Sequence, residues 1–302
     1  MLLNNNIIKP QTKAYIFALT AVLLWSTVAT AFKLALAIYD FFQVLFISSG
    51  VATFFLFIIL ILQKKLSLLF QIPKKERQKL VIAGLLNPFL YYIILFKAYS
   101  LLPAQIAQSL NYTWPIVLVI FSLIAFHQKL KPKTAISFLL GFLGVLIISF
   151  KGQPSLPPHT NFLGILLAIG SSLIWASFWI IKTTAKTDIL VSLFVNFLIG
   201  FIASIATMFI FSSFPHYDNV SLAASIYAGL FEMGVTFLIW MLALKLSSSV
   251  AKISNLIFLS PFLSLIFISF ILNEKILIST VTGLTVIIIG ILTDKIPFRK
   301  TT

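Results

Sequence analysis

Long apolar runs separated by short polar gaps are the dominant pattern of this chain. Each run has about 20 mostly apolar residues, the length that a helix needs to cross the hydrocarbon core of a bilayer. The runs do not alternate polar and apolar residues over about ten positions, as strands of a membrane barrel would. The pattern therefore predicts an all-α integral membrane protein. Ten transmembrane helices are expected, at residues 14–36, 41–62, 80–102, 104–126, 134–150, 162–182, 189–211, 222–244, 250–272 and 276–293.

The composition supports this interpretation. Hydrophobic residues make up 60% of the 302 residues, charged residues only 10%, and the mean hydropathy is +1.08. Soluble domains have about 25% charged residues. The net charge of +15 would otherwise suggest a nucleic-acid partner. Because the charges lie in the gaps between the apolar runs, we expect no nucleic acid and assign the basic excess to membrane insertion.

The positions of the basic residues predict the orientation. With a cytoplasmic N-terminus, only Lys33, Lys97, Lys151 and Lys275 of the 22 Lys and Arg residues fall on the opposite side. Cytoplasmic loops carry the excess of Lys and Arg. Both termini should therefore be cytoplasmic. The first apolar run is long enough to be a retained helix rather than a cleaved signal peptide.

The two halves of the chain resemble each other. The stretch at 23–33 reads LLWSTVATAFK, and the stretch at 173–183 reads LIWASFWIIKT. Five spans is an odd number, so the second half must enter the membrane in the opposite orientation. We therefore expect two inverted five-helix repeats, residues 1–150 and 151–302, with a binding site between them near the midplane.

Two prolines occupy equivalent positions in the repeats. Pro115 and Pro261 lie near the centres of the fourth and ninth spans. A proline inside a helix removes one backbone hydrogen bond and bends the helix. They are either a pair of hinges or kinks that serve packing alone.

The fourth span has a polar side. Gln105, Gln108, Ser109, Asn111 and Tyr112 fall within half of the helix circumference at 100° per residue. Polar groups are costly in hydrocarbon, so this side should face an internal cavity, or alternatively hydrogen-bond to other helices. Other spans offer matching polar or aromatic residues within the membrane. The candidate binding residues are Trp25, Ser26, Tyr91, Tyr92, Gln108, Asn111, Tyr112, Trp114, Trp175, Trp179, Thr236 and Trp240.

Glu232 is the one acid well inside a predicted span. Such a carboxyl is a functional candidate by default. It would carry a proton, bind a substrate ammonium, pair with Lys97 or Lys252, or be purely structural. Lys33, near a span end, is expected to extend its ammonium toward water. Glu274, at the outer end of the ninth span, is expected to be solvated.

Metal and cofactor chemistry is not indicated. The chain has no cysteine, and His127, His159 and His216 fall in predicted loops without metal-ligand spacing. No phosphate-binding glycine loop is present, and neither paired carboxylates nor a nucleophile with a base lies within a span. We therefore expect no cofactor, no metal and no enzyme activity.

Several motifs carry a family resemblance. LLWS opens the first half and LIWAS the second, and residues 271–292 read ILNEKILISTVTGLTVIIIGIL. These features resemble the drug/metabolite transporter superfamily, EamA type. Three further stretches, LLWSTV, NYTWP and MGVTFLIW, are similar to the YddG-type exporters of aromatic amino acids.

The resemblance implies a central cavity that opens alternately to each side. It places near the substrate Trp25, Ser26, Asn111, Tyr112, Trp114, Trp175 and Trp240. Two positions depart from the family pattern. Gln128 stands where the first half usually has Glu, and Glu232 falls where the aromatic exporters have a neutral residue, so substrate or coupling is expected to differ.

The leading interpretation is a secondary transporter in the bacterial inner (plasma) membrane that exports aromatic or apolar amino acids by alternating access. An importer of a nucleotide-like metabolite, such as S-adenosylmethionine, is an alternative, and an anionic substrate would need Lys97 and Lys252 in the cavity. A membrane scaffold or interaction protein is the alternative of another class. The expected partners are a small-molecule substrate and the lipid bilayer, and the chain is expected to act as a monomer or a homodimer.

Overall fold

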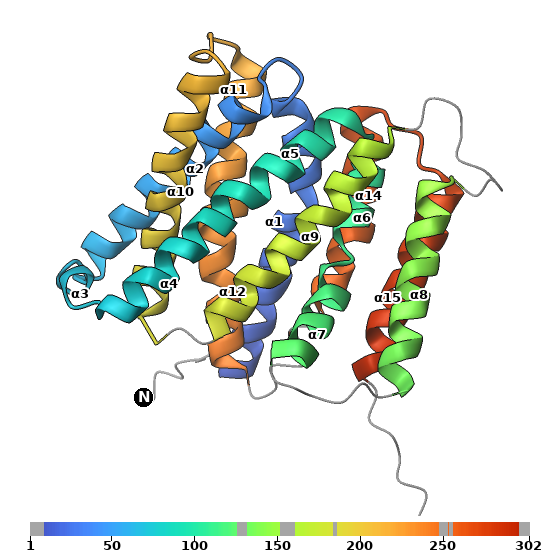
Figure 1. Ribbon diagram of the computed structural model, residues 1–302, viewed down its shortest axis with the longest axis horizontal. Coiled ribbons are helices and arrows are strands. Elements are labelled where there is room, and N and C mark those ends of the chain that lie inside the picture. Colours follow the sequence, from blue (N-terminus) through green and yellow to red (C-terminus); the bar gives the residue numbers. More distant parts are fainter. Residues whose placement is uncertain are drawn as a thin grey trace, which may run out of the picture.

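The computed structural model describes residues 9–125, 132–151, 161–183, 186–247, 253 and 256–295. Within these ranges the regular secondary structure is helical throughout (Figure 1). The elements are α1 (Pro10–Ala35), α2 (Phe41–Leu62), α3 (Ser67–Phe70), α4 (Lys74–Gly84), η1 (Leu85–Leu90), α5 (Tyr91–Leu101), α6 (Ala104–Asn111), α7 (Trp114–Ala125), α8 (Pro132–Ser149), α9 (Phe162–Thr183), α10 (Ile189–Phe211), α11 (Asn219–Tyr227), η2 (Ala228–Val235), α12 (Thr236–Leu246), η3 (Leu256–Leu259), α14 (Ser260–Leu272) and α15 (Ile278–Lys295).

These elements form the ten expected spans. Seven helical stretches of the described chain are long and apolar enough to cross a bilayer, and the shorter apolar helices at Ala135–Ser149, Leu256–Leu272 and Ile278–Thr293 occupy the other three positions. Large apolar side chains such as Phe54 and Phe142 lie exposed on the outer surface, as lipid-facing residues do. The prediction of an all-α integral membrane protein is confirmed.

The third and eighth spans are interrupted at equivalent places. The π-helical segment η1 joins α4 to α5, and the π-helical segment η2 joins α11 to α12. Within η1, Asn87 leaves helical geometry (φ −143°, ψ 119°) directly before Pro88. π-helical segments inside α-helices occur frequently at functional sites. Both interruptions lie on spans that the sequence pattern reads as continuous helices.

The fourth and ninth spans are also divided, and each division precedes a proline. Helix α6 ends at Asn111 and α7 begins at Trp114, so Pro115 lies in the first turn of α7. Pro261 lies in the first turn of α14, directly after the 3₁₀ segment η3. Proline is well tolerated in a first turn, where its missing N–H has no intrahelical partner. Pro115 therefore begins a new half-helix, whereas Pro261 follows a change from 3₁₀ to α geometry within one continuous apolar helix, Leu256–Leu272.

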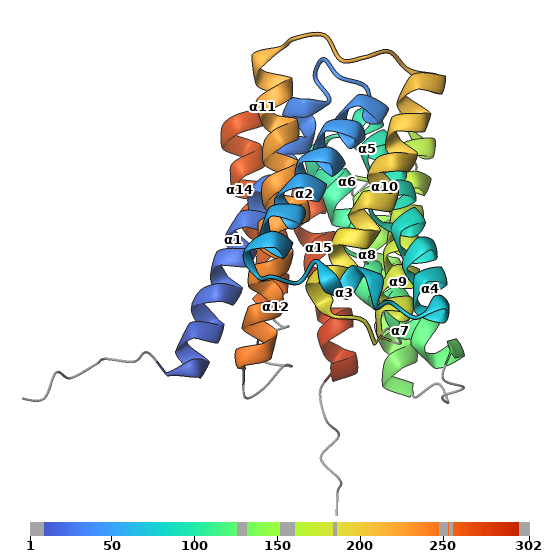
Figure 2. The ribbon, with the colours of Figure 1, turned by 90° about the vertical axis from the view of Figure 1, so that its left-hand side faces the viewer.

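The first helix of each half packs against helices of the other half. Helix α1 packs against α12 and α14 of the second half, and α9 packs against α5, α6 and α7 of the first. Helix α2 pairs with α10, and α8 pairs with α15 (Figures 1 and 2). The first helix of each half thus packs against the third and fourth spans of the other half, and the second and fifth spans pair with their own counterparts. This is the arrangement expected of two inverted repeats.

Glycines allow α8 and α15 to approach closely. A Cβ atom added at Gly144 would lie 2.6 Å from the carbonyl oxygen of Gly283, and one added at Gly283 would lie 2.7 Å from that of Gly144. Small residues at such contacts are the usual basis of helix association in membranes. Backbone contact therefore holds the final spans of the two halves together.

Candidate functional site

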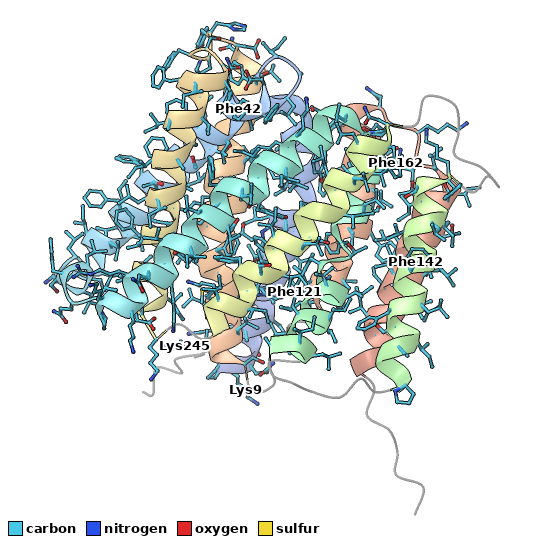
Figure 3. The ribbon with its side chains drawn as sticks, viewed as in Figure 1. Lys9, Phe42, Phe121, Phe142, Phe162 and Lys245 are labelled. Atoms are coloured by element: carbon cyan, nitrogen blue, oxygen red, sulfur yellow. The ribbon has the colours of Figure 1, made fainter. Side chains whose placement is uncertain are left out.

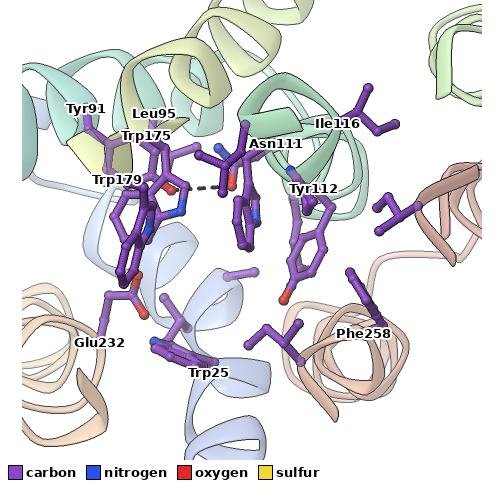
Figure 4. A pocket seen from close by; sticks show the side chains of 18 of the residues that line it. Trp25, Tyr91, Leu95, Asn111, Tyr112, Ile116, Trp175, Trp179, Glu232 and Phe258 are labelled. Carbon is purple, nitrogen blue, oxygen red and sulfur yellow. Dashed lines mark hydrogen bonds between the residues drawn. The ribbon is translucent and has the colours of Figure 1, made fainter. Parts of the chain in front are cut away.

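A cavity of about 410 Å³ lies between the two halves. Its walls come from both repeats, chiefly from α1, α5, α6, α7, α9, η2 and α12 (Figure 4). Ligand pockets for small molecules have volumes of about 300–1,000 Å³. The candidate residues that line it are Trp25, Tyr91, Gln108, Asn111, Tyr112, Trp114, Pro115, Trp175, Trp179, Glu232 and Trp240.

Other candidates do not line the cavity. The hydroxyl of Ser26 donates to the carbonyl of Leu23 on its own helix, at 2.6 Å. The hydroxyl of Thr236 likewise donates to the carbonyl of Phe231. Short hydroxyl side chains often bond to their own helix in this way, so sharing a helix face with a site does not place them in it.

Two more candidates, Lys97 and Pro261, lie elsewhere. The ammonium of Lys97 lies 5.1 Å from the ring centre of Phe41, away from the cavity, so the structure does not pair it with Glu232. Pro261 is buried but is not part of the cavity wall. Lys252 lies outside the described residues.

The carboxyl of Glu232 is buried in the cavity wall on η2. Its Oε1 accepts a hydrogen bond of 2.9 Å from the phenol of Tyr92, which lies behind the wall instead of lining it. Figure 4 shows the same carboxyl beside Trp25, with which it also forms a side-chain hydrogen bond. Among the described residues that line the cavity, Glu232 is the sole acid, and none is Lys or Arg. The site therefore presents one carboxyl and no described basic side chain.

Asn111 is the centre of a second polar group. Its Oδ1 accepts from the phenol of Tyr91 at 3.3 Å, and its Nδ2 donates to the hydroxyl of Ser171 at 2.8 Å. These bonds join α5, α6 and α9 at the point where α6 ends. Asn111 and Tyr112 line the cavity, and the bonds of Asn111 to other helices also match the alternative expectation for this polar side. Of the same predicted polar side, Gln108 also lines the cavity, whereas Gln105 and Ser109 do not.

Two polar atoms at the cavity wall are buried without a hydrogen-bond partner among the described residues. They are Oε1 of Gln108 and the indole nitrogen of Trp179. An unmet donor or acceptor in a buried position costs free energy of about 1–3 kcal/mol. Both atoms lie behind the surface of the cavity, so neither contacts a solute in this conformation.

Aromatic rings form most of the remaining wall. The ring centre of Trp175 lies 4.7 Å from that of Tyr91, 6.1 Å from that of Trp179 and 5.9 Å from that of Phe237. Phe237 also packs edge-on against Trp25, at 6.0 Å. Phe237 therefore connects the two tryptophans that occupy equivalent positions in the repeats.

Several residues that line the cavity are not among those predicted from the sequence, including Phe32, Leu95, Tyr99, Phe237 and Phe258. Helical spacing was a usable signal for some of them. Leu95 and Tyr99 follow Tyr91 at intervals of four on α5, so they share its face. Phenylalanine is too frequent in this chain, at 31 residues, for its presence alone to mark a site.

One end of the cavity is crossed by hydrogen bonds between the halves. The carboxyl of Glu274 accepts from the backbone N–H groups of Ala104 and Gln105, at 2.8 and 3.4 Å. It therefore caps the first turn of α6, which has no side-chain cap of its own. Glu274, which the sequence analysis expected to be solvated, is half-buried, and its carboxyl also satisfies a helix terminus of the other repeat.

Gln105 completes this connection. Its Nε2 donates to the carbonyl of Lys275 at 3.0 Å, and its Oε1 accepts from the N–H of Leu277 at 2.9 Å and from the hydroxyl of Thr280 at 3.0 Å. The segment between α14 and α15 is thus bound to the start of α6. We call these bonds of Glu274 and Gln105 the inter-repeat latch.

Lys33 supports the same end of the molecule. Its ammonium donates to the carbonyls of Tyr99 and Leu102, at 2.8 and 3.0 Å. Cations are favourable at the C-terminal end of a helix, here α5. Lys33 is half-buried, and its ammonium lies at the end of the span, where these carbonyls bind it.

The cavity extends away from the latch. Leu244 near the end of α12, Ser137 near the start of α8 and Ile291 near the end of α15 contribute to its wall. These positions lie toward the end of the molecule that carries Lys9 and Lys245 (Figures 1 and 3). We call this the Lys9 end, and the structure is latched at the opposite end.

Ten spanning helices around one polar and aromatic cavity between two repeats define a multi-pass membrane transporter. The chain belongs to the EamA-like transporter family, whose model matches residues 12–150 and 162–293. The two matched segments correspond to the two repeats.

Curated relatives agree with this assignment. The uncharacterized transporter YoaV of Bacillus subtilis is 26% identical over 297 residues, covering 95% of this chain and 98% of that protein. The uncharacterized transporter YvbV of the same organism is 25% identical over 215 residues, covering 70% and 69%. An uncharacterized transporter of Clostridium kluyveri is 24% identical over 288 residues, covering 92% and 91%.

A solved crystal structure shares the fold. It superimposes with a TM-score of 0.65 at 21% identity, over 93% of this chain and 96% of that one. At this level of identity the likeness concerns the fold alone.

Proposed function

We propose that this transporter moves amino acids with aromatic or apolar side chains by alternating access, in the direction of export. The supporting observation is the composition of the cavity: aromatic rings for an apolar body, the polar cluster at Asn111, and the carboxyl of Glu232. Aromatic walls favour apolar groups and positively charged heads. The two repeats would rock around this site, with the divisions before Pro115 and Pro261 as hinges.

The direction of export rests on the predicted orientation. With both termini cytoplasmic, the Lys9 end faces the cytoplasm, and the structure corresponds to an inward-facing state, from which an exporter would load its solute. The latch at the opposite end would have to open to release the solute.

An anionic, nucleotide-like substrate has less support. It would require basic groups in the cavity, and Lys97 lies over the ring of Phe41 instead. A neutral zwitterion needs no net charge compensation beyond what the cavity offers. Its carboxylate would be met by neutral polar groups of the cavity wall.

Purified protein reconstituted into liposomes would test the proposal. Counterflow of labelled phenylalanine, tyrosine, tryptophan and leucine should be detectable, and Asn111→Ala should lower it by about tenfold, because the cluster loses its centre. Asn219→Ala, at the exposed start of α11, is the matched control and should leave the rate unchanged. Counterflow of nucleotides without that of any amino acid would overturn the proposal.

A further inference from the structure

We infer that the cavity selects its solute by a positively charged amino group, which pairs with Glu232, so that aromatic amines without a carboxylate are also substrates. The inference deepens the proposed function and rests on the same cavity. It assigns a chemical requirement to one residue, and it predicts which part of the solute is dispensable.

The surroundings of Glu232 supply the first argument. A carboxyl that is ionised in an apolar, aromatic wall needs a compensating positive charge. The described residues that line the cavity include no Lys or Arg that would supply it. Lys97 does not supply the charge either, because its ammonium lies over the ring of Phe41. Because the described part of this wall supplies no such charge, the solute's amino group is placed to supply it when the carboxyl is ionised.

The rings beside the carboxyl supply the second argument. Figure 4 places Glu232 beside Trp25, in a cavity wall that also contains Tyr91, Trp175 and Trp179. A cation that meets the carboxyl would also lie close to aromatic faces, which attract ammonium groups, Trp most strongly. An amine with an aromatic body therefore finds both of its parts matched within a cavity of about 410 Å³.

The position of Tyr92 supplies the third argument. Its phenol binds Oε1 of Glu232 from behind the cavity wall, at 2.9 Å, and it contributes nothing to the lining itself. A tyrosine placed in this way fixes the carboxyl without occupying the space of the solute. Tyr92 is thus a positioning residue for Glu232, joining the third span to the eighth.

The carboxylate of an amino acid has no such fixed counterpart among the described residues. The polar atoms available to it are neutral, and no described cation lines the cavity. Removal of the solute's carboxylate should therefore cost little, whereas removal of its amine should cost most of the affinity.

Three probes of one skeleton separate these contributions: tyrosine, tyramine, which lacks the carboxylate, and 3-(4-hydroxyphenyl)propionate, which lacks the amine. Each would compete with labelled tyrosine, or with labelled tyramine, for binding to the full-length protein. We expect tyramine to compete at least as well as tyrosine, and the deaminated compound to be weaker by tenfold or more. Equal competition by the deaminated compound would overturn the inference.

Variants locate the effect. Glu232→Gln should weaken tyramine binding by at least about tenfold and leave binding of the deaminated compound unchanged or improved. Glu76→Gln, a carboxyl at the start of α4 bound to Lys79 and outside the cavity, is the matched control. Unchanged tyramine binding by Glu232→Gln would overturn the inference. If that variant does not fold, the order of the three probes on the unmodified protein still decides.

The outcome is distinguishable from failure of the proposed function. Tyramine binding without any amino-acid counterflow would support the inference and reject the amino acid as the transported solute. Amino-acid counterflow with an equally strong deaminated competitor would support the proposed function and reject the inference.

Discussion

The phenol of Tyr92 and the carboxyl of Glu232 are joined by a hydrogen bond of 2.9 Å. The bond connects the two spans that are interrupted in the middle, since Tyr92 follows η1 directly along the chain and Glu232 lies within η2. The equivalent interruptions of the two repeats therefore meet at the one acid of the described cavity wall.

Tyr92→Phe should weaken solute binding although it changes no residue of the cavity wall. The carboxyl loses a fixed donor, and a hydrogen bond to a charged group contributes about 1.5–3 kcal/mol. The apparent affinity for an amine should fall by about tenfold or more, measured by titration of the purified protein. Tyr217→Phe, on the exposed loop before α11, is the control. An unchanged affinity would show that Glu232 keeps its position without Tyr92.

Glu274→Gln should loosen the inter-repeat latch. An amide carries no charge to complement the N-terminus of α6 and has one acceptor oxygen in place of two. The latched end should then open more often, because the bonds to Ala104 and Gln105 are weakened.

The absence of native cysteine makes this measurable. A single cysteine placed at buried Ile106, in the first turns of α6, would be labelled by an impermeant maleimide added at the latched side. Labelling should be several-fold faster with Glu274→Gln than with Glu274 intact. Glu76→Gln is the control, and equal rates in all three proteins would mean that the latch does not limit access.

Gly144→Ala should destabilise the pairing of α8 with α15. The new Cβ would lie 2.6 Å from a backbone oxygen of Gly283, and overpacking of this kind costs about 1–3 kcal/mol. Gly170→Ala on α9 is the matched control, because a Cβ there meets nothing within 4 Å. Thermal unfolding in detergent should show a lower midpoint for Gly144→Ala and an equal or higher one for Gly170→Ala. Equal midpoints for the two variants would contradict the close approach.

Asp188→Asn should weaken the start of α10. The carboxyl of Asp188 accepts from the backbone N–H groups of Leu190 and Val191 and pairs with Lys65 at 2.8 Å. Asparagine caps a helix about as well as aspartate, so the loss is chiefly that of the pair with Lys65, and the free energy of unfolding should fall by about 0.2–1 kcal/mol.

The same carboxyl gives a pH dependence. Partial burial raises the pKa of Asp188, but the bonds from Lys65 and Val191 outweigh it and lower the pKa below its ordinary value. The stabilisation is therefore complete above the unfolded pKa of about 3.9 and is lost as the pH falls through the lower folded pKa. The difference in unfolding midpoint between the natural protein and Asp188→Asn should be constant near neutral pH and shrink below about pH 4. A difference that grows on acidification would contradict this assignment.

The spans were predictable because lipid imposes length and composition on each helix separately. Even the divisions of the fourth and ninth spans had a signal in Pro115 and Pro261. The interruption at η1 also has a signal in the sequence, the pair Asn87 and Pro88, which the prediction of a continuous third span did not use. The segment η2 contains no proline, and its form follows from packing against neighbouring helices.

The cavity was predictable where polarity within a span is unusual, as at Asn111 and Glu232. It was not predictable for Ser26 and Thr236, whose hydroxyls bond to their own helices. Glu274 could not be assigned from the sequence either, because its partners belong to the start of α6, 170 residues away. Such a contact depends on how the repeats meet, and periodicity within one helix carries no information about that.

The exchange of α1 and α9 between the repeats has a consequence for dissection of the molecule. Each repeat, produced alone, would lack the neighbours against which its first helix packs. A fragment ending near residue 151 should therefore be an incomplete bundle, in which α1 lacks its packing partners α12 and α14. Two complementary fragments, synthesised together, should assemble because each supplies the helices against which the first helix of the other packs. The assembled pair should then form the complete bundle, which neither fragment forms alone.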